Sequence, residues 1–126
     1  MDLSKIKFRG RTINGEWVYG LLAHTEDKRI CRDIGYFISN SAGCPFAYQV
    51  IPETIGRYTG VDDIDGVEIY ENDLVEYTLD SEGTPIIGLV EYIVDGFTLE
   101  KRRYPIYLKD AYNKRVLGKR TETVLL

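Results

Sequence analysis

Residues 50–77 read VIPETIGRYTGVDDIDGVEIYENDLVEY, and three turn signals interrupt this alternating apolar stretch. The fixed φ of Pro52 suits the first position of a turn or of a single helical turn. Asp65 and Gly66 lie between apolar residues and mark a tight hairpin, for which residues 68–71 form the returning arm. The third turn lies at Asn72. The stretch therefore predicts short strands joined by tight turns.

On the C-terminal side the same alternation continues. We expect strands at 74–79 and 86–93, a turn at 80–85, another turn at Asp95-Gly96, strands at 97–99 and 104–108, a helical turn within 109–115, and closing segments at 116–118 and 124–126. Pro105 favours an edge position for its strand. Short strands at this spacing predict a small closed or half-closed barrel, which leaves few exposed edges.

The N-terminal side carries the strongest hairpin signal in the chain. Asn14-Gly15 predicts a type I′ turn between a strand at 8–11 and a second strand that begins near Trp17. Trp17, Tyr19 and Leu21 alternate with smaller or charged residues, so we expect this row on one face of the strand and in the core. Residues 23–33 predict a turn, and 34–38 and 46–51 are β-like segments around a small-residue loop at 39–45.

The composition is that of a globular β protein. The chain has 126 residues and is 44% hydrophobic, with ten Tyr, four Phe and one Trp. Aromatic residues favour pleated surfaces. No run approaches the apolar length of a membrane span, and residues 1–15 are polar and basic without the apolar core of a signal peptide. We expect one small mainly β protein with little helix, in the cytoplasm.

The net charge of −4 conceals an uneven layout. Residues 1–30 carry six basic and four acidic groups, residues 31–95 two and thirteen, and residues 96–126 eight and three. Such a field can steer a basic partner to the middle or nucleic acid to the C-terminal third, or it can favour a homo-oligomer through opposite patches. An ordinary solvated surface explains it equally well.

Few side chains here suit a metal site. Cys31 and Cys44 have no CxxC partner and His24 is the only histidine, so we expect no zinc. A disulfide would fit if the strands of the two cysteines paired, but a cytosolic compartment favours two small buried thiols. The acidic run 62–66 resembles a calcium loop, but aligning Gly66 as its sixth position puts Val61 first and Asn72 twelfth. Neither residue suits its place, so we expect a solvated hairpin tip instead.

The sequence offers no catalytic constellation. There is no Gly-x-Ser-x-Gly, P-loop or dinucleotide fingerprint, and the glycines fall singly at turns. Nothing places His24 beside either cysteine, and paired carboxylates such as Glu68 and Glu71 need a cleft before they imply catalysis. We therefore expect no enzymatic activity and no cofactor.

The strongest binding candidate is the run 101–107, in which three cations precede two tyrosines. Cations neutralise phosphates and aromatic rings stack on bases, so this run predicts a nucleic-acid surface. The other interpretation is a charged strand edge that blocks aggregation, with the tyrosines in the core. The residues concerned are Lys101, Arg102, Arg103, Tyr104 and Tyr107.

Three segments together, 7–11, 15–20 and 52–75, closely resemble the YopX-like family of small phage and prophage proteins. The resemblance implies an N-terminal β region, here 1–54, followed by an SH3-like barrel, here 55–126, and it implies no settled activity. The family usually has Gly where this chain has Asn72, and Asn is the non-glycine residue that best tolerates a left-handed backbone. The ending 118–123 departs from the family's pattern.

Three functions follow as hypotheses. The first is a non-enzymatic phage or prophage accessory protein that binds an unknown host or phage macromolecule. The second is a nucleic-acid-binding module that uses residues 101–107, whose binding would be sensitive to salt. The third is an SH3-like adaptor, whose groove of exposed tyrosines such as Tyr58 and Tyr70 would bind proline-rich peptides.

Overall fold

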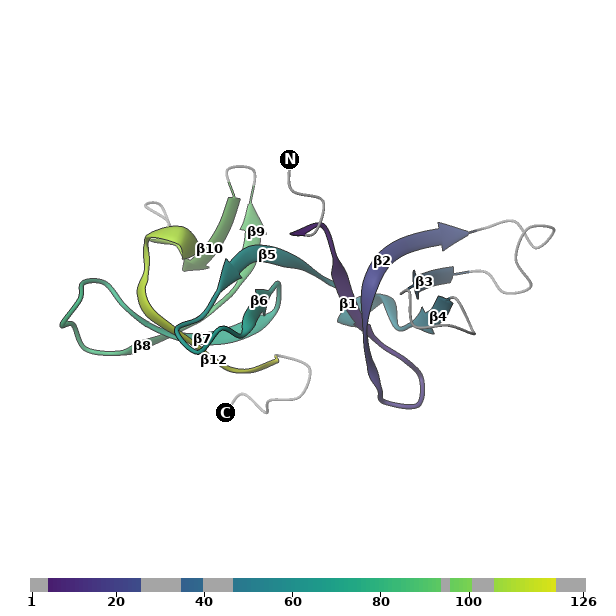
Figure 1. Ribbon diagram of the computed structural model, residues 1–126, viewed down its shortest axis with the longest axis horizontal. Helices are drawn as coiled ribbons and strands as arrows, with labels where there is room; N and C mark the ends of the chain where they lie inside the picture. Colours follow the sequence, from purple (N-terminus) through teal and green to yellow (C-terminus); the bar gives the residue numbers. More distant parts are fainter. Residues whose placement is uncertain (1–4, 26–34, 40–46, 94–95, 101–105, 120–126) are drawn as a thin grey trace. The chain divides into compact units, whose positions relative to one another are not determined.

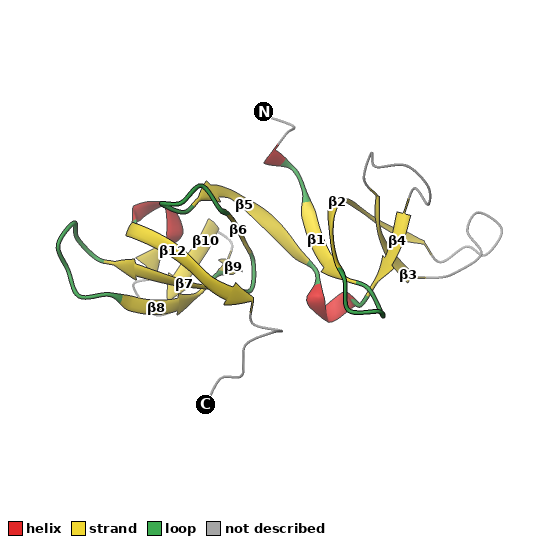
Figure 2. Cartoon of the chain, turned by 60° about the horizontal axis from the view of Figure 1, so that its bottom comes forward, coloured by secondary structure: helices red, strands yellow, loops and turns green. Residues whose placement is uncertain are grey.

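The computed structural model describes residues 5–25, 35–39, 47–93, 96–100 and 106–119. The chain divides into two compact units, Met1–Arg57 and Tyr58–Leu126. Strands dominate the described residues, and helix is limited to short 3₁₀ turns (Figure 2). The prediction of a mainly β protein with little helix is therefore confirmed.

The elements follow one another along the chain as labelled in Figure 1. They are β1 (Phe8–Arg11), β2 (Trp17–Thr25), β3 (Gly35–Ser39), β4 (Ala47–Val50), η2 (Pro52–Thr54), β5 (Gly56–Asp62), β6 (Glu68–Tyr70), β7 (Asp73–Thr78), β8 (Ile86–Leu89), β9 (Glu91–Ile93), β10 (Gly96–Glu100), β11 (Ile106–Tyr107), η3 (Leu108–Asp110) and β12 (Tyr112–Lys119).

In the first unit, antiparallel strands lie in the order β4-β3-β2-β1, and the start of β5 pairs with β1. One face of this sheet holds the core, in which Val18, Ile38 and Val50 are buried. A Cβ at Gly10 would lie 2.9 Å from the Val50 Cβ. Glycine at this position therefore lets β1 approach the core closely.

The prediction that Trp17, Tyr19 and Leu21 form a core row is wrong. Val18 is the buried residue of this alternation, and Leu22 packs against the same core. Tyr19 is 42% exposed and Leu21 is 59% exposed. Because side chains alternate across a strand, the row of Trp17 and its neighbours faces away from the core.

The hairpin predicted at Asn14-Gly15 is present, but its turn is not type I′. That type needs positive φ at both central residues, whereas only Gly15 has it, at 90°. The Gly15 N–H donates to the Thr12 carbonyl at 2.9 Å, and the Thr12 N–H donates to the Glu16 carbonyl at 2.8 Å. The loop is thus one residue longer than a two-residue hairpin and ends on a left-handed glycine.

The second unit contains the same turn. The Gly66 N–H donates to the Asp63 carbonyl at 3.0 Å, the Asp63 N–H donates to the Val67 carbonyl at 2.8 Å, and Gly66 has φ 81°. The turn therefore joins β5 to β6 as the corresponding turn joins β1 to β2. In both turns the residue after the first is an exposed isoleucine, Ile13 or Ile64.

The remaining strands of the second unit form two antiparallel sheets, β12-β7-β8 and β11-β10-β9. A core lies between them, with Val75, Tyr77, Val90, Leu99 and Leu108 buried together with other apolar side chains. Across the described residues these sheets are open, and no closed barrel is found.

The segment 109–119 differs from its predicted structure. The helical turn is present as η3, but it ends at Asp110 and β12 then runs from Tyr112 to Lys119. Figure 1 shows β12 crossing beside β7, its antiparallel partner. A left-handed Asn113, with φ 53°, accompanies the irregular register there. This irregularity interrupts the alternation of apolar and polar residues, so the sequence did not predict β12 as one strand.

Candidate functional site

The predicted site at 101–107 is only partly within the described residues. Lys101, Arg102, Arg103 and Tyr104 lie outside them, as do Cys31, Cys44 and residues 124–126. Tyr107 is half-buried in β11, and the Lys109 Nζ lies 6.0 Å from the centre of its ring. This distance is at the outer limit of a cation–π contact.

A cavity of about 300 Å³ opens beside Tyr107. It is lined by Thr59, Val61, Gly96, Phe97, Tyr107, Leu108 and Lys109. The Thr59 hydroxyl is already engaged, because it donates to the Ile69 carbonyl at 2.7 Å. The cavity therefore offers aromatic walls and one cation but few polar groups to orient a ligand.

Tyr58 and Tyr70 do not form the exposed groove expected of a peptide receptor. Both rings are buried, 6% and 2% exposed, and they pack against each other with centroids 5.4 Å apart. The Tyr58 hydroxyl donates to Asp62, and the Tyr70 hydroxyl donates to Glu68 at 3.1 Å. The prediction of a groove built from these two rings is wrong, because the rings help to form the β5–β6 hairpin.

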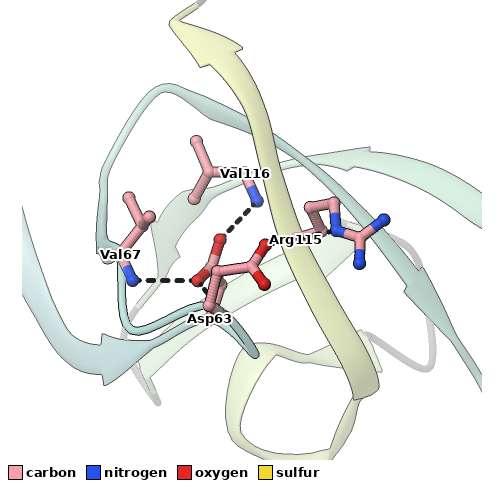
Figure 3. A network of polar contacts seen from close by, with 5 residues as sticks. Asp63, Val67, Arg115 and Val116 are labelled. Carbon is pink, nitrogen blue, oxygen red and sulfur yellow. Dashed lines mark hydrogen bonds and ion pairs between the residues drawn. The ribbon is translucent and has the colours of Figure 1, made fainter.

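Asp63 is the centre of a polar network rather than part of a solvated tip (Figure 3). One carboxylate oxygen accepts from the N–H groups of Asp65 at 2.8 Å and Val67 at 2.9 Å. The other accepts from the Val116 N–H at 3.0 Å. The side chain is 8% exposed. The carboxylate thus ties the β5–β6 turn to β12.

Burial alone would raise the pKa of Asp63. The backbone N–H groups of Val116, Val67 and Asp65 and the nearby charge of Arg115 outweigh this effect, so the pKa of Asp63 lies below its ordinary value. Three donors already converge on the carboxylate, so it is poorly placed to ligate a cation. Only the outer part of the acidic run is solvated, as at Asp65, which is 59% exposed and pairs with Arg115 at 3.4 Å.

Asp73 has a similar structural role at the next turn. It is fully buried and accepts from the Tyr70 N–H at 2.8 Å. Asn72 has φ 71°, which confirms the left-handed conformation expected there. Its N–H donates to the Val90 carbonyl at 2.9 Å. The second and third turns of the stretch 50–77 are therefore each held by a buried aspartate.

One face of the sheet in the first unit carries Tyr19, which at 42% is the most exposed Phe, Trp or Tyr side chain among the described residues of that unit. The register of β1 to β4 and the alternation of side chains place one set of residues on this face. We call it the outward face, and its residues are Arg9, Arg11, Trp17, Tyr19, Leu21, Ala23, Phe37, Ser39, Ala47 and Gln49.

Cations accompany the aromatic rings on the outward face. The Arg9 guanidinium carbon lies 5.2 Å from the centre of the Trp17 ring. The Arg11 Nε donates to the Gly15 carbonyl at 3.2 Å, which orders that guanidinium beside the hairpin. Among the outward positions that the structure describes, none carries a carboxylate.

Sequence reasoning had identified this row but assigned it to the wrong face. Both faces of β2 are apolar, so alternation places Val18 and Tyr19 on opposite faces without showing which face is buried. The residues that distinguish the two faces lie on other strands. Arg9 and Arg11 are the cross-strand neighbours of Tyr19 and Trp17, and charged residues opposite the row favour its exposure. Arg9 itself is buried, at 3% exposed, so Arg11 is the better indicator of the two.

The fold defines a small, mainly β protein of two units, whose first unit exposes Tyr19 and Leu21 on one face of its sheet. A family model described as YopX protein matches residues 7–117, which is most of the chain. The chain therefore belongs to the YopX family. Comparison with curated proteins gave no match.

Within the residues that the structure describes, no group of three or more His, Cys, Asp or Glu side chains is arranged to hold a metal ion. No helix in the same residues is long and apolar enough to cross a membrane.

Proposed function

We propose that the protein is a phage- or prophage-encoded accessory protein of the bacterial cytoplasm, a non-enzymatic module that binds a macromolecule through the outward face. The exposed row on β2 carries this proposal. Tyr19 and Leu21 leave apolar surface in water while the opposite face of the same sheet has its own core. Exposed apolar side chains gathered on one face are typical of interaction sites.

The proposal includes an SH3-like architecture for the second unit. Its support is the close approach of the two sheets, since a Cβ at Gly88 would lie 2.5 Å from the Leu99 carbonyl oxygen. Buried side chains of β7 and β10 also belong to one core, as they would in a barrel.

The carboxylates described above support a binding role over a catalytic one. Asp63 and Asp73 each accept hydrogen bonds from backbone N–H groups and hold turns. Catalytic carboxylates would instead face a cleft.

Affinity capture from phage-bearing cells tests the proposal when it compares matched variants. Tyr19→Ser combined with Leu21→Ser removes the exposed row. Tyr112→Ser combined with Leu117→Ser changes side chains of similar exposure, 50% and 48%, on β12 of the second unit. The proposal predicts that a stoichiometric partner is lost from the first double variant alone. Equal capture by both variants would show that the partner does not bind through the outward face.

The second candidate function is nucleic-acid binding through residues 101–107. Tyr107 and Lys109 beside the cavity favour it. The charge of the unit does not, because residues 58–126 carry eight basic and fourteen acidic side chains. Neutralising Lys101, Arg102 and Arg103 together would abolish salt-sensitive binding if this run were the site.

A further inference from the structure

We infer that the ligand of the outward face is single-stranded nucleic acid. This inference rests on the proposed function, because it names the partner of the same surface. It depends on three properties of that surface. They are its aromatic rings, of which Tyr19 is exposed while Trp17 and Phe37 are half-buried, the ordered guanidinium of Arg11, and the absence of carboxylates among its described positions.

The spacing of the aromatic rings on the outward face suits the stacking of nucleic-acid bases. Trp17 and Tyr19 are two residues apart on β2, so their side chains leave the same face about 6.7 Å apart. This spacing is comparable with that of successive nucleotides in an extended strand. Phe37 pairs with Ala23 on the neighbouring strand and adds a third ring to the face. Every base has a flat π face, so aromatic side chains on a sheet can stack on bases of any sequence.

The charge of the face matches a phosphate backbone. Arg11 is a cross-strand partner of Trp17, and its Nε donates to the Gly15 carbonyl, which orders the guanidinium at the hairpin turn. Residues 1–57 carry eight basic and six acidic side chains, so the first unit is positive although the whole chain is negative. Nucleic acid would therefore be attracted to the first unit and repelled by the second.

A single strand fits better than a duplex. In a duplex the bases are stacked on each other and present only their edges, so rings on a flat sheet cannot reach their faces. DNA and RNA share the features that this surface would recognise, and the experiment below measures one single strand of each, so that a difference in their affinities would identify the preferred one.

The test measures fluorescence anisotropy of labelled oligothymidine, oligouridine and a DNA duplex with the full-length protein at two salt concentrations. We expect both single strands to bind more tightly than the duplex and to weaken at high salt. Loss of one stacking ring should weaken binding by about ten-fold or more in Tyr19→Ala. Tyr19→Phe retains the ring and should bind as the unchanged protein does, and so should Tyr112→Ala.

Arg11 is tested separately because it also holds the hairpin. Arg11→Gln should lower the slope of log affinity against log salt by about 0.7, the value for one phosphate contact with a single strand. Arg11→Lys keeps the charge without the guanidinium fork and should restore the slope. Unfolding curves of both variants show whether the hairpin has survived.

Several outcomes would overturn the inference. Equal binding of duplex and single strand would show attraction by charge without stacking. Loss of binding only when Lys101, Arg102 and Arg103 are neutralised would place the nucleic acid on the C-terminal run. If neither oligonucleotide binds while Tyr19→Ser with Leu21→Ser still loses a captured partner, the inference fails and the proposed function stands. That result would indicate a protein as the partner.

Discussion

The Asp63 carboxylate accepts a hydrogen bond from the Val116 N–H at 3.0 Å, across 53 positions of sequence. The same side chain accepts two N–H groups of its own turn. One residue thus orders the β5–β6 hairpin and attaches it to β12. We regard it as a principal reason why the stretch 50–77 adopts its structure.

Asp63→Asn should lower the free energy of unfolding by about 2 to 3 kcal/mol. Asparagine can keep one oxygen for Asp65 and Val67, but its amide nitrogen would then face the Val116 N–H, donor against donor. Asp65→Asn is the matched control, because its exposed ion pair with Arg115 contributes less than about 1 kcal/mol. Urea unfolding of both variants measures the difference, and similar losses would contradict the assigned role.

Acid should destabilise the protein partly through Asp63. Its folded pKa lies below the unfolded value, which is about 3.9. The stabilisation is therefore complete above that value and is lost as the pH falls through the folded pKa. Unfolding free energies measured across the acid range should fall less steeply in Asp63→Asn than in the unchanged protein. Parallel curves would show that other carboxylates account for the loss.

Tyr58 should make the stability of the protein depend on pH in the alkaline range. Burial first, and then the hydrogen bond to Asp62 and the charges of Asp62 and Glu68, raise the pKa of its phenol. Above about pH 10 the unfolded chain ionises this group while the folded chain does not, so stability falls as the pH rises. Tyr58→Phe should lessen this alkaline loss, whereas Tyr112→Phe, at an exposed position, should leave it unchanged. An unaltered alkaline slope in Tyr58→Phe would refute the assignment.

Two glycine substitutions should differ because their costs have different origins. At Gly66 a Cβ would meet nothing within 4 Å, so Gly66→Ala costs only the left-handed backbone, about 1 kcal/mol. At Gly88 a Cβ would collide with the Leu99 carbonyl, so Gly88→Ala should cost about 2 to 3 kcal/mol. Chemical denaturation ranks the two variants. A cost at Gly88 no larger than at Gly66 would argue against the close approach of β8 and β10.

Local signals in the sequence predicted much of the fold. Alternation predicted the strands around Phe37 and Val75, and Asn72 was expected to be left-handed because few other residues tolerate that conformation. The predictions failed where the local structure depends on residues that are far away in the sequence. The burial of Asp63 depends on the Val116 N–H, which no local pattern reveals.

The candidate surface was harder to predict than the fold. Its aromatic row was visible in the sequence, but the face of the strand that it occupies depends on how β2 packs against β1 and β3. One face of β2 carries valine and leucine and the other carries aromatic residues, and the composition of either face suits a core. Register resolves the choice, because it sets Arg11 opposite Trp17.

Trp17 allows the most direct test of the outward face, because it is the only tryptophan in the chain. Its fluorescence therefore reports on this surface alone. The account predicts that oligothymidine quenches Trp17 emission saturably, that high salt weakens the effect, and that Tyr19→Ala shifts it to higher oligonucleotide concentration while Tyr112→Ala does not. Unchanged Trp17 emission at concentrations where anisotropy shows binding would place the ligand elsewhere and contradict the central claim.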